Sequence, residues 1–341
     1  MNGKKLLRIL LIADGLPGHI NQSRGLVLWM SERYRLQCQE LDVGLRCKWL
    51  TRLLLPWMLH RGWNNAMVLR AYSYKVGALQ KPDVIISSGG NTSFLNIALA
   101  QNWQIPNIFI GSGRRLRSNN FAAHLTLEPT DQPHNIVMDL APAITNPVVM
   151  ARQGQELRYM LDIQTEQKLY MMALGGDGAG YRYDDSACQQ IALLMNEISH
   201  RDGCRWLLTT SRRSGHRFEK SLKTLIDPEL LADAVWWNAM PRKVMNAYMG
   251  AADQIFISID SMSMIGEGIS SGKPVTLLQP EFANPESRYQ QALDKYCRSG
   301  YCIIQLLDAP ALPLLDRKGN SADAKKKLLD KLNDLLANYH S

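Results

Sequence analysis

Short hydrophobic runs alternate with longer helical patterns along most of this 341-residue chain. Runs of strand length cover Leu6–Ala13 and residues 84–87, 107–110, 169–174, 205–210, 235–237, 254–258 and 274–278. Segments of helical character lie between and after them, over residues 22–33, 48–60, 64–80, 92–102, 185–200, 216–226 and 322–337. Because buried strands that alternate with helices are typical of parallel sheets, the pattern predicts an α/β fold.

The alternation stops between residues 128 and 165, where four prolines lie in polar surroundings. A stretch of this kind is typical of a linker. The alternation then resumes, so we expect two doubly wound halves, with a first domain over residues 1–145, a second over 165–320 and a closing helix over 321–341.

Charge is distributed unevenly between the halves. The whole chain carries +8, but residues 1–127 hold 16 Lys and Arg against 5 Asp and Glu, whereas residues 128–341 hold 23 against 26. A one-sided positive field attracts phosphates, anionic lipid or nucleic acid, and the alternative is a solvated basic face. The basic half contains no known readout motif, so we expect no nucleic-acid partner. The mix of 46% hydrophobic and 21% charged residues excludes disorder and a disulfide mini-scaffold.

The six cysteines lack a CxxC pair and are interpreted as buried thiols in a reducing cytosol. The absence of a signal peptide and of a run of about 20 apolar residues predicts a cytoplasmic protein. Residues 46–63 mix tryptophans, leucines and basic side chains as interfacial helices do, which predicts peripheral contact with the inner face of the cytoplasmic membrane. The alternative is a core helix interrupted at Pro56. The expected contact residues are Trp49, Arg52, Trp57, Arg61 and Trp63.

Two familiar nucleotide-binding motifs are absent from the sequence. The first strand is followed by DGLPGH instead of GxGxxG, and residues 268–274 lack the spacing and the Ser or Thr of a P-loop. Glycine-rich or polar loops nevertheless follow four strands, at residues 14–22, 87–92, 175–181 and 260–264. Since ligands of open α/β sheets gather at the carboxyl ends of strands, these loops predict a ligand in a cleft between the domains.

The fourth loop leads into a helix on which Ser263 and Glu267 share one face. Glu267 lies among apolar residues, where a carboxylate needs donors, and a ribose diol supplies two hydroxyls. Asp260 and Ser261 are good N-cap residues, a structural role that they can fill as well. After another strand, the paired Arg212 and Arg213 are suited to hold a diphosphate, and the alternative is a solvated loop.

Six segments together resemble one bacterial and plant family: DGLPGHINQSRGL, SSGGNTSF, GSGRR, LGGDGAGY, TTSRRSG and DSMSMIGEGISSGKPV. Its members are labelled nucleoside-diphosphate-sugar epimerase-like or mitochondrial-fission-protein-like. The similarity covers about residues 6–279, and the Asp-Ser-x-Ser-Met-x-x-Glu segment is its most specific part. The family looks like GT-B glycosyltransferases, which implies two Rossmann-like domains facing a cleft. The N-terminal one would bind the acceptor and the C-terminal one the nucleotide sugar.

The resemblance also implies site residues. Glu267 corresponds to the acidic residue that holds the nucleotide ribose in many GT-B enzymes. His19 lies where the lipid-linked N-acetylglucosaminyltransferase of murein synthesis ends its first glycine loop in histidine, so the expected catalytic bases are His19 and Asp14. Nucleotide-sugar contacts are expected from Gly175, Gly176, Tyr181, Thr210, Ser211, Arg212, Arg213, Asp260, Ser261, Ser263, Met264 and Glu267. Acceptor or phosphate contacts are expected from Gln22, Ser23, Gly89, Gly90, Asn91, Arg114 and Arg115.

The favoured function is a glycosyltransferase that moves a sugar from a nucleotide-sugar donor to an anionic acceptor, lipid-linked or of the lipopolysaccharide type, in envelope glycan assembly. No DxD pair occurs in a donor-side loop, so we expect neither a metal nor another cofactor, and the nucleotide sugar is the substrate. Arginines and backbone amides would balance the leaving diphosphate. The alternatives are a sugar-nucleotide epimerase with the same two domains and a non-catalytic adaptor at the membrane surface.

Overall fold

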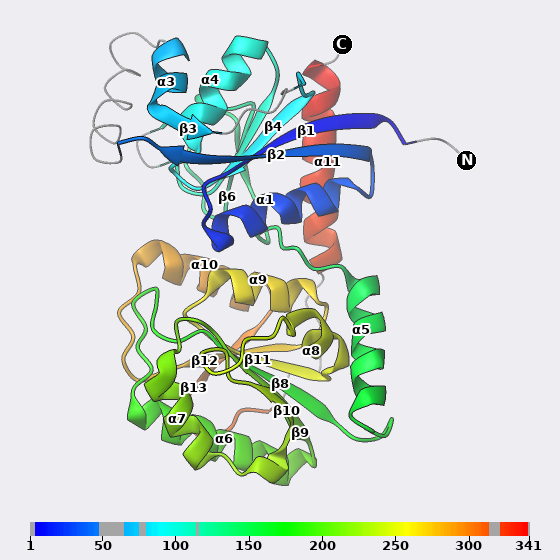
Figure 1. The fold of residues 1–341 in the computed structure, drawn as a ribbon, viewed down its shortest axis with the longest axis vertical. Helices are drawn as coiled ribbons and strands as arrows, with labels where there is room; N and C mark the ends of the chain where they lie inside the picture. Colours follow the sequence, from blue (N-terminus) through cyan, green and yellow to red (C-terminus); the bar gives the residue numbers. More distant parts are fainter. Residues whose placement is uncertain (1–3, 48–64, 75–79, 114–115, 314–320, 340–341) are drawn as a thin grey trace. The chain divides into compact units, whose positions relative to one another are not determined.

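The computed structural model describes residues 4–47, 65–74, 80–113, 116–313 and 321–339. The chain forms two compact units (Figure 1). Unit 1 comprises Met1–Ile144 together with Ala322–Ser341, and unit 2 comprises Thr145–Ser321. Each unit is built on one largely parallel sheet, so the α/β fold class predicted from the alternating pattern is confirmed.

The sheet of unit 1 has the strand order β3-β2-β1-β4-β5-β6-β7 in the described part of the chain. All neighbouring strands are parallel except β2 and β3. The order reverses between β1 and β4, which pair directly, as in a doubly wound fold. The strands are β1 (Leu6–Ala13), β2 (Arg35–Leu45), β3 (Tyr72–Tyr74), β4 (Val84–Ser88), β5 (Asn107–Ile110), β6 (Ala123–Thr126) and β7 (Asn135–Val137).

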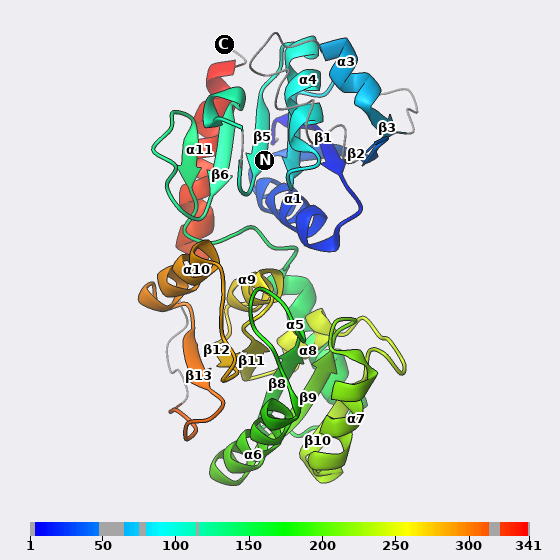
Figure 2. The same ribbon diagram turned by 90° about the vertical axis from the view of Figure 1, so that its left-hand side faces the viewer.

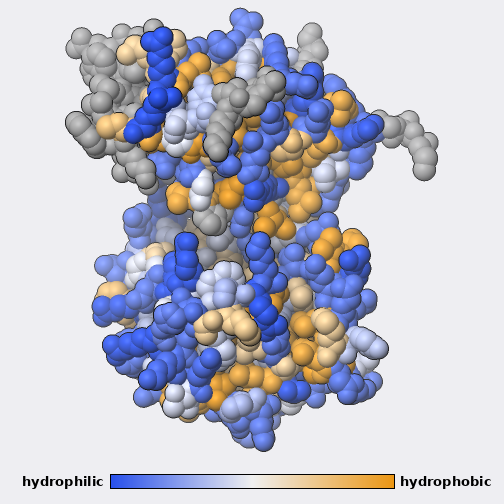
Figure 3. Space-filling view, in the orientation of Figure 1, coloured by the Kyte–Doolittle hydropathy of each residue, from blue (hydrophilic) through white to orange (hydrophobic). Residues whose placement is uncertain are grey.

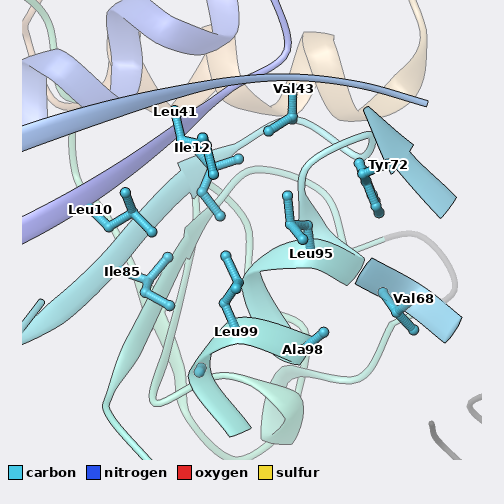
Figure 4. Close-up of a cluster of buried hydrophobic side chains, with 11 residues drawn as sticks. Leu10, Ile12, Leu41, Val43, Val68, Tyr72, Ile85, Leu95, Ala98 and Leu99 are labelled. Atoms are coloured by element: carbon cyan, nitrogen blue, oxygen red, sulfur yellow. The ribbon is translucent and has the colours of Figure 1, made fainter. Parts of the chain in front are cut away.

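Helices cover both faces of this sheet. They are α1 (Pro17–Met30), α3 (Asn65–Ala71), α4 (Ser93–Trp103) and α11 (Ser321–Tyr339), with a short 3₁₀ turn, η1 (Ser118–Asn120). Leu10 and Ile12 of β1 pack with α3 and α4 in one cluster (Figure 4), whereas Leu11 and Ala13 pack on the opposite face with α1. This alternation follows from the period of two residues in a strand and explains why β1 is apolar from Ile9 to Ala13.

The C-terminal helix α11 packs within unit 1. Arg33 forms an ion pair with Asp330, and the Tyr34 hydroxyl donates to Asn333 Oδ1 at 2.6 Å. Four of its leucines are buried, namely Leu328, Leu329, Leu332 and Leu336. The last helix therefore completes the unit in which the chain begins.

Unit 2 has the strand order β10-β9-β8-β11-β12-β13, and all of these strands are parallel. This is the Rossmann order, with its reversal between β8 and β11. The strands are β8 (Leu169–Leu174), β9 (Arg205–Thr210), β10 (Leu231–Val235), β11 (Gln254–Ser258), β12 (Val275–Gln279) and β13 (Ile303–Leu306). The helices are α5 (Pro147–Met160), α6 (Asp185–Asp202), α7 (Gly215–Leu225), η2 (Pro228–Leu230), α8 (Met245–Ala251), α9 (Met262–Ser270) and α10 (Ser287–Arg298).

Two pairs of helices pack closely within unit 2. Helices α6 and α7 lie side by side (Figures 1 and 2). Helices α5 and α8 meet through Gly154 and Gly250, and a Cβ on either glycine would overlap the backbone of the other helix. On the face shown in Figure 3, hydrophilic residues cover most of each unit and hydrophobic residues are scattered between them.

Several element predictions were wrong. The expected linker over 128–165 contains β7 and α5 instead. Helix α5 forms there because Asn146 caps it by accepting from the amides of Val148 and Val149, and because Pro147 is favourable in the first turn of a helix. The expected helix over 64–80 ends at Ala71 and is followed by β3, and the strand expected at 235–237 instead ends at Val235. Residues 48–60 lie outside the described residues. The expected helix start at residue 22 lies five residues too late, because Pro17 begins α1.

Candidate functional site

Both sheets place the predicted loops where the strand order reverses. In unit 1 the loops after β1 and β4 are neighbours because those strands pair directly, and in unit 2 the same holds for the loops after β8 and β11. In open α/β sheets, ligands bind at the carboxyl edge at this topological switch point. The four loops therefore form two candidate sites, one in each unit.

Asp14 and His19 form a hydrogen-bonded pair in unit 1. Because α1 begins at Pro17, His19 falls in the first helical turn, and its ring reaches back to the end of β1. His19 Nδ1 lies 3.0 Å from Asp14 Oδ2 and 3.2 Å from Oδ1. The Asp14 side chain is 3% exposed and that of His19 is 38% exposed. A buried carboxylate thus holds an imidazole that solvent reaches.

Asp14 is itself held by the loop after β4. Its Oδ2 accepts from Asn91 Nδ2 at 3.2 Å, and its Oδ1 accepts from the Leu16 amide at 3.2 Å. Asn91 is fixed in turn by Tyr72, whose hydroxyl donates to the Asn91 carbonyl at 2.7 Å. The carboxylate has little freedom to rotate and therefore constrains the imidazole.

The pair fixes the tautomer of His19. Because a carboxylate only accepts hydrogen bonds, Nδ1 carries the proton of the neutral ring and Nε2 keeps its lone pair. A partly exposed imidazole oriented by a buried carboxylate has the arrangement of a general base. The structure thus pairs the two residues that the sequence left as separate candidates for the base.

The His19 ring lies against the backbone of Gly89. This glycine has φ of +86°, and a Cβ on it would overlap the imidazole. Glycine is required here both for the left-handed backbone and for the close approach. The next residue, Gly90, has open space where its Cβ would be, so this side of the loop is free to meet a ligand.

Gln22 and Ser23 turn toward the protein. Gln22 Oε1 accepts from the Ser88 hydroxyl at 3.1 Å and so ties α1 to β4. Ser23 is fully buried, and its hydroxyl has no hydrogen-bond partner among the described residues. The predicted residues that lie outside the described part of the chain are Arg114, Arg115, Trp49, Arg52, Trp57, Arg61 and Trp63.

Asp260 is the buried acid of unit 2. Its side chain has no exposed surface, and its Oδ2 accepts from Arg213 Nη2 at 2.6 Å. The Asp260 carboxylate lies against Gly175, where a Cβ would overlap it, and Arg213 Nη1 donates to the Asp177 carbonyl at 3.3 Å. The glycine loop after β8, Arg213 after β9 and Asp260 after β11 thus form one packed group.

Burial raises the pKa of Asp260 to about 6, although a hydrogen bond from Ser258 and the charge of Arg213 favour its charged form. Within the described residues Oδ1 of Asp260 is buried and has no hydrogen-bond partner. The Arg213 side chain that forms the ion pair with this carboxylate is 41% exposed. The predicted diphosphate ligand Arg213 is already engaged by an acid, whereas Arg212 is exposed.

Other predicted nucleotide residues are engaged within the protein. The Thr210 hydroxyl is buried and donates to Glu219 Oε1 at 2.5 Å. The Ser211 hydroxyl donates to the Gly175 carbonyl and accepts from the Arg213 amide at 3.0 Å. Tyr181 is only 2% exposed. These side chains shape the loops, which leaves backbone groups as the part of the loops able to meet a ligand.

Glu219 is the structural residue that the sequence analysis missed. Its Oε1 also accepts from the backbone and side-chain amides of Asn238, both at 3.0 Å, so it joins α7, β9 and the segment after β10. The signal was present, because Glu219 lies in the buried stripe of α7 with Phe218 and Leu222.

Helix α9 begins at Met262 after Ser261, whose side chain makes no capping hydrogen bond. The first amides of the helix are therefore not capped by that residue, and a helix N-terminus of this kind attracts anions. Ser263, Met264 and Glu267 are half-buried on this helix. The i,i+4 pair predicted from the sequence thus lies on a real helix beside the Asp260 loop.

A pocket of about 270 Å³ lies beside the glycine loop in unit 2. Its wall carries Arg182, Arg213 and Arg217 together with three aspartates. Arg217 forms an ion pair with Asp185 at 2.5 Å, so charges of both signs line it. Among the described residues no group of three or more His, Cys, Asp and Glu side chains is arranged to hold a metal ion. None of the described helices is long and apolar enough to span a membrane.

Several solved structures are similar to this chain over nearly its whole length. UDP-GlcNAc 2-epimerase from Methanocaldococcus jannaschii matches with a TM-score of 0.54 at 12% identity, over 96% of this chain and 99% of that one. ADP-heptose lps heptosyltransferase II from E. coli matches with a TM-score of 0.47 at 11% identity, over 98% and 100%. A glycosyl transferase family 9 protein from Veillonella parvula matches with a TM-score of 0.48 at 13% identity, over 97% of each chain.

At such identities the likeness speaks for the fold alone. The likeness to these solved structures and the two doubly wound units show a GT-B-like fold. This confirms the fold that the family resemblance of the sequence implied. A comparison with curated proteins gave no match. The family model described as Mitochondrial fission ELM1 matches residues 17–305, and this range includes His19, the glycine loop of unit 2 and Glu267. The chain belongs to the Mitochondrial fission ELM1 family.

Proposed function

We propose that this protein is a glycosyltransferase that moves a sugar from a nucleotide-diphosphate sugar to a hydroxyl of an anionic glycan or lipid-linked acceptor. The Asp14–His19 pair is the observation that carries the proposal. The His19 side chain is oriented by Asp14 and is 38% exposed at the switch point of unit 1. Glycosyl transfer requires a group that takes the proton of the acceptor hydroxyl.

Unit 2 supplies the donor site in this proposal. The N-terminus of α9, without a side-chain cap from Ser261, and the backbone amides near Gly176 would bind the diphosphate. Glu267, one turn after Ser263, would accept from the ribose hydroxyls. Arg212 is exposed and would add a charge-assisted contact to a phosphate.

The reaction is one displacement at the anomeric carbon. His19 Nε2 takes the proton of the acceptor hydroxyl, and the acceptor oxygen bonds to the anomeric carbon. The bond from that carbon to the diphosphate oxygen breaks, and the electron pair leaves with the nucleoside diphosphate. Preorganised amides and guanidinium groups stabilise the charge that develops on the leaving group. The buried Asp14 stabilises the imidazolium formed in this step.

The charge of unit 1 supports an anionic acceptor. Unit 1 holds 20 Lys and Arg against 11 Asp and Glu, a net +9, whereas unit 2 holds 19 against 20. A positive unit concentrates phosphorylated or carboxylated acceptors by long-range attraction. Envelope glycan intermediates at the inner face of the cytoplasmic membrane have this chemistry, and they are the acceptors that we propose.

A ligand panel followed by a product assay tests the proposal. The purified protein is heated with UDP, ADP, GDP, CDP and dTDP, and a ligand present at 100 times its Kd is expected to stabilise it by about 2.7 kcal/mol. The matching nucleotide sugar is then incubated with and without anionic glycolipid. Acceptor-dependent release of nucleoside diphosphate supports a transferase. Conversion of the sugar without acceptor would identify an epimerase, and failure of every nucleotide to bind would refute a donor site in unit 2.

A further inference from the structure

Cys297 and Cys302 form a thiol pair that the proposed reaction does not use. Cys297 lies in the last turn of α10 and Cys302 lies immediately before β13. Their sulfur atoms are 3.7 Å apart. Cys302 is buried, whereas Cys297 is half-buried and can be reached from solvent. A spacing of five residues gave no sign of this pair in the sequence.

The turn between them holds the two thiols together. Gly300 has φ of +71°, its amide donates to the Cys297 carbonyl at 3.0 Å, and the Tyr301 amide donates to the Tyr296 carbonyl at 3.0 Å. These two bonds are those of a Schellman motif, which commonly carries an apolar contact between the same two flanking residues. The rings of Tyr296 and Tyr301 supply it, with centroids 6.2 Å apart. The chain is thereby folded back so that Cys302 faces Cys297.

The two sulfur atoms differ in their chemistry. The two sulfur atoms lie within hydrogen-bond distance, and this contact lowers the pKa of Cys297 and raises that of Cys302. The more exposed sulfur is thus the better nucleophile, and the buried one is placed to react with it afterwards. Elsewhere in unit 2, burial raises the pKa of Cys188 to about 12 and that of Cys204 to about 11.

We propose that Cys297 and Cys302 are a redox-active dithiol that closes to an intramolecular disulfide on exposure to a peroxide. The Cys297 thiolate attacks the O–O bond, and a sulfenic acid and, after protonation, one water are formed. The Cys302 sulfur then displaces the hydroxyl group of the sulfenic acid, and a second water leaves. Two thiols are oxidised and one peroxide is reduced. A disulfide needs sulfur atoms about 2.05 Å apart, so the pair has to close by roughly 1.7 Å.

The bond would tie the end of α10 to the start of β13. The other half of α10 carries Tyr289, whose hydroxyl donates to the Ile259 carbonyl at 2.8 Å, directly before Asp260. Oxidation is therefore expected to reduce fluctuations of α10 and of the turn at residues 297–303. Hydrogen exchange of the backbone amides in this turn should slow in the oxidised protein.

Hydrogen peroxide with differential alkylation and mass spectrometry tests the proposal on the full-length protein. We expect the thiols of Cys297 and Cys302 to disappear together, about tenfold faster than that of the exposed Cys38, and a peptide linked through both residues to appear. A thiol reductant should restore both thiols. Cys302→Ser should stop the reaction at a sulfenic acid on Cys297, trapped with dimedone, and Cys297→Ser should leave Cys302 reduced. Cys204→Ser is the matched control and should form the disulfide at the wild-type rate.

Gly300→Ala tests the role of the turn. Alanine disfavours the left-handed backbone, so disulfide formation should slow severalfold while the thiol of Cys38 reacts as before. The proposal is overturned if Cys38 is oxidised while both thiols persist, or if Cys297 forms only sulfinic acid or mixed disulfides with added glutathione. Because the readout is thiol chemistry, these outcomes are independent of any glycosyltransferase activity.

Discussion

Two buried aspartates differ in what their partners can do. Asp14 is paired with an imidazole, whose two nitrogens can donate or accept, whereas Asp260 is paired with a guanidinium, which only donates hydrogen bonds. In the proposed reaction, proton transfer therefore falls to unit 1 and charge balance to unit 2. Asp14 and His19 lie in one segment after β1, so their proximity follows from the sequence. The partner of Asp260 was not predictable, because Arg213 follows β9 and Asp260 follows β11, and only the folded sheet brings these two loops together.

In the proposed reaction, substitutions of His19 and Asp14 should lower kcat by different amounts. His19→Ala should lower kcat by about 10²–10⁴ with nearly unchanged nucleotide affinity, because it removes the base and leaves the donor site intact. Asp14→Asn should cost less, since it keeps the ring but loses the orienting carboxylate. His200→Ala, at an exposed histidine of unit 2, is the control and should have no effect. Equal activity of wild type and His19→Ala in the transfer assay would remove His19 from the reaction.

Glu267→Ala should lower the affinity for the donor nucleotide and leave the fold intact. We expect nucleoside diphosphate affinity to fall by about 1.5–3 kcal/mol, the value of charge-assisted hydrogen bonds to the ribose, with the thermal transition retained because Glu267 is only half-buried. Titration calorimetry measures the change. Glu229→Ala, at an exposed position in η2, should bind as wild type does. An unchanged affinity would contradict the assignment of Glu267, and a lost transition would make its role structural.

Asp260 predicts a pH dependence of stability. Burial raises its pKa from 3.8 to about 6, so between these values the folded state holds a proton that the unfolded state has released. The contribution of Asp260 to the free energy of unfolding is greatest below pH 4 and is lost as the pH rises through 6. This loss amounts to at most about 3 kcal/mol. Asp260→Asn should remove that slope from the free energy of urea unfolding, measured from pH 4 to 7. Parallel curves for wild type and variant would show that Arg213 already compensates the charge.

At the scale of elements, apolar runs predicted the central strands and missed the marginal ones. Strands β4 and β8 are buried along their length and β1 is buried from Ile9 to Ala13, so their composition alone identifies them. Strand β2 was missed because most of its residues are exposed and polar, and it is ordered by pairing with β1 over eight residues. Such a strand is specified by its neighbour, which a single sequence does not reveal.

Because α5 and α8 are in close contact, a single added methyl group between them should lower the free energy of unfolding. Gly250→Ala would place a Cβ into the Met150 carbonyl of α5, and the helices have to move apart, at a cost of about 1–3 kcal/mol in unfolding free energy. Urea denaturation followed by circular dichroism measures it. Gly18→Ala is the matched control, because its Cβ would meet no atom within 4 Å and should change stability little. Equal midpoints for the two variants would refute the close packing.

At the scale of the whole molecule, the sequence predicted two doubly wound halves but not how the chain is divided between them. The last helix joins unit 1 through Asp330 and Asn333, contacts that span about 300 positions and leave no local signal. The charge asymmetry was visible in the sequence because it depends on composition alone. It follows the division into units, with +9 in unit 1 and −1 in unit 2.

This asymmetry predicts salt-sensitive binding to anionic membranes. Vesicles containing phosphatidylglycerol should sediment the protein at low ionic strength and release it at about 0.5 M salt, because screening shortens the reach of the +9 charge to a few ångströms, whereas neutral vesicles should not bind it. Trp57→Ser with Arg61→Ser, in the segment proposed from the sequence, should weaken binding at low salt. Lys223→Ser in unit 2, which also removes one positive charge, is the matched control for lost charge. If the double variant binds as well as this control, the field of unit 1 acts without that segment. If wild type ignores anionic vesicles at low salt, the proposed membrane contact is refuted.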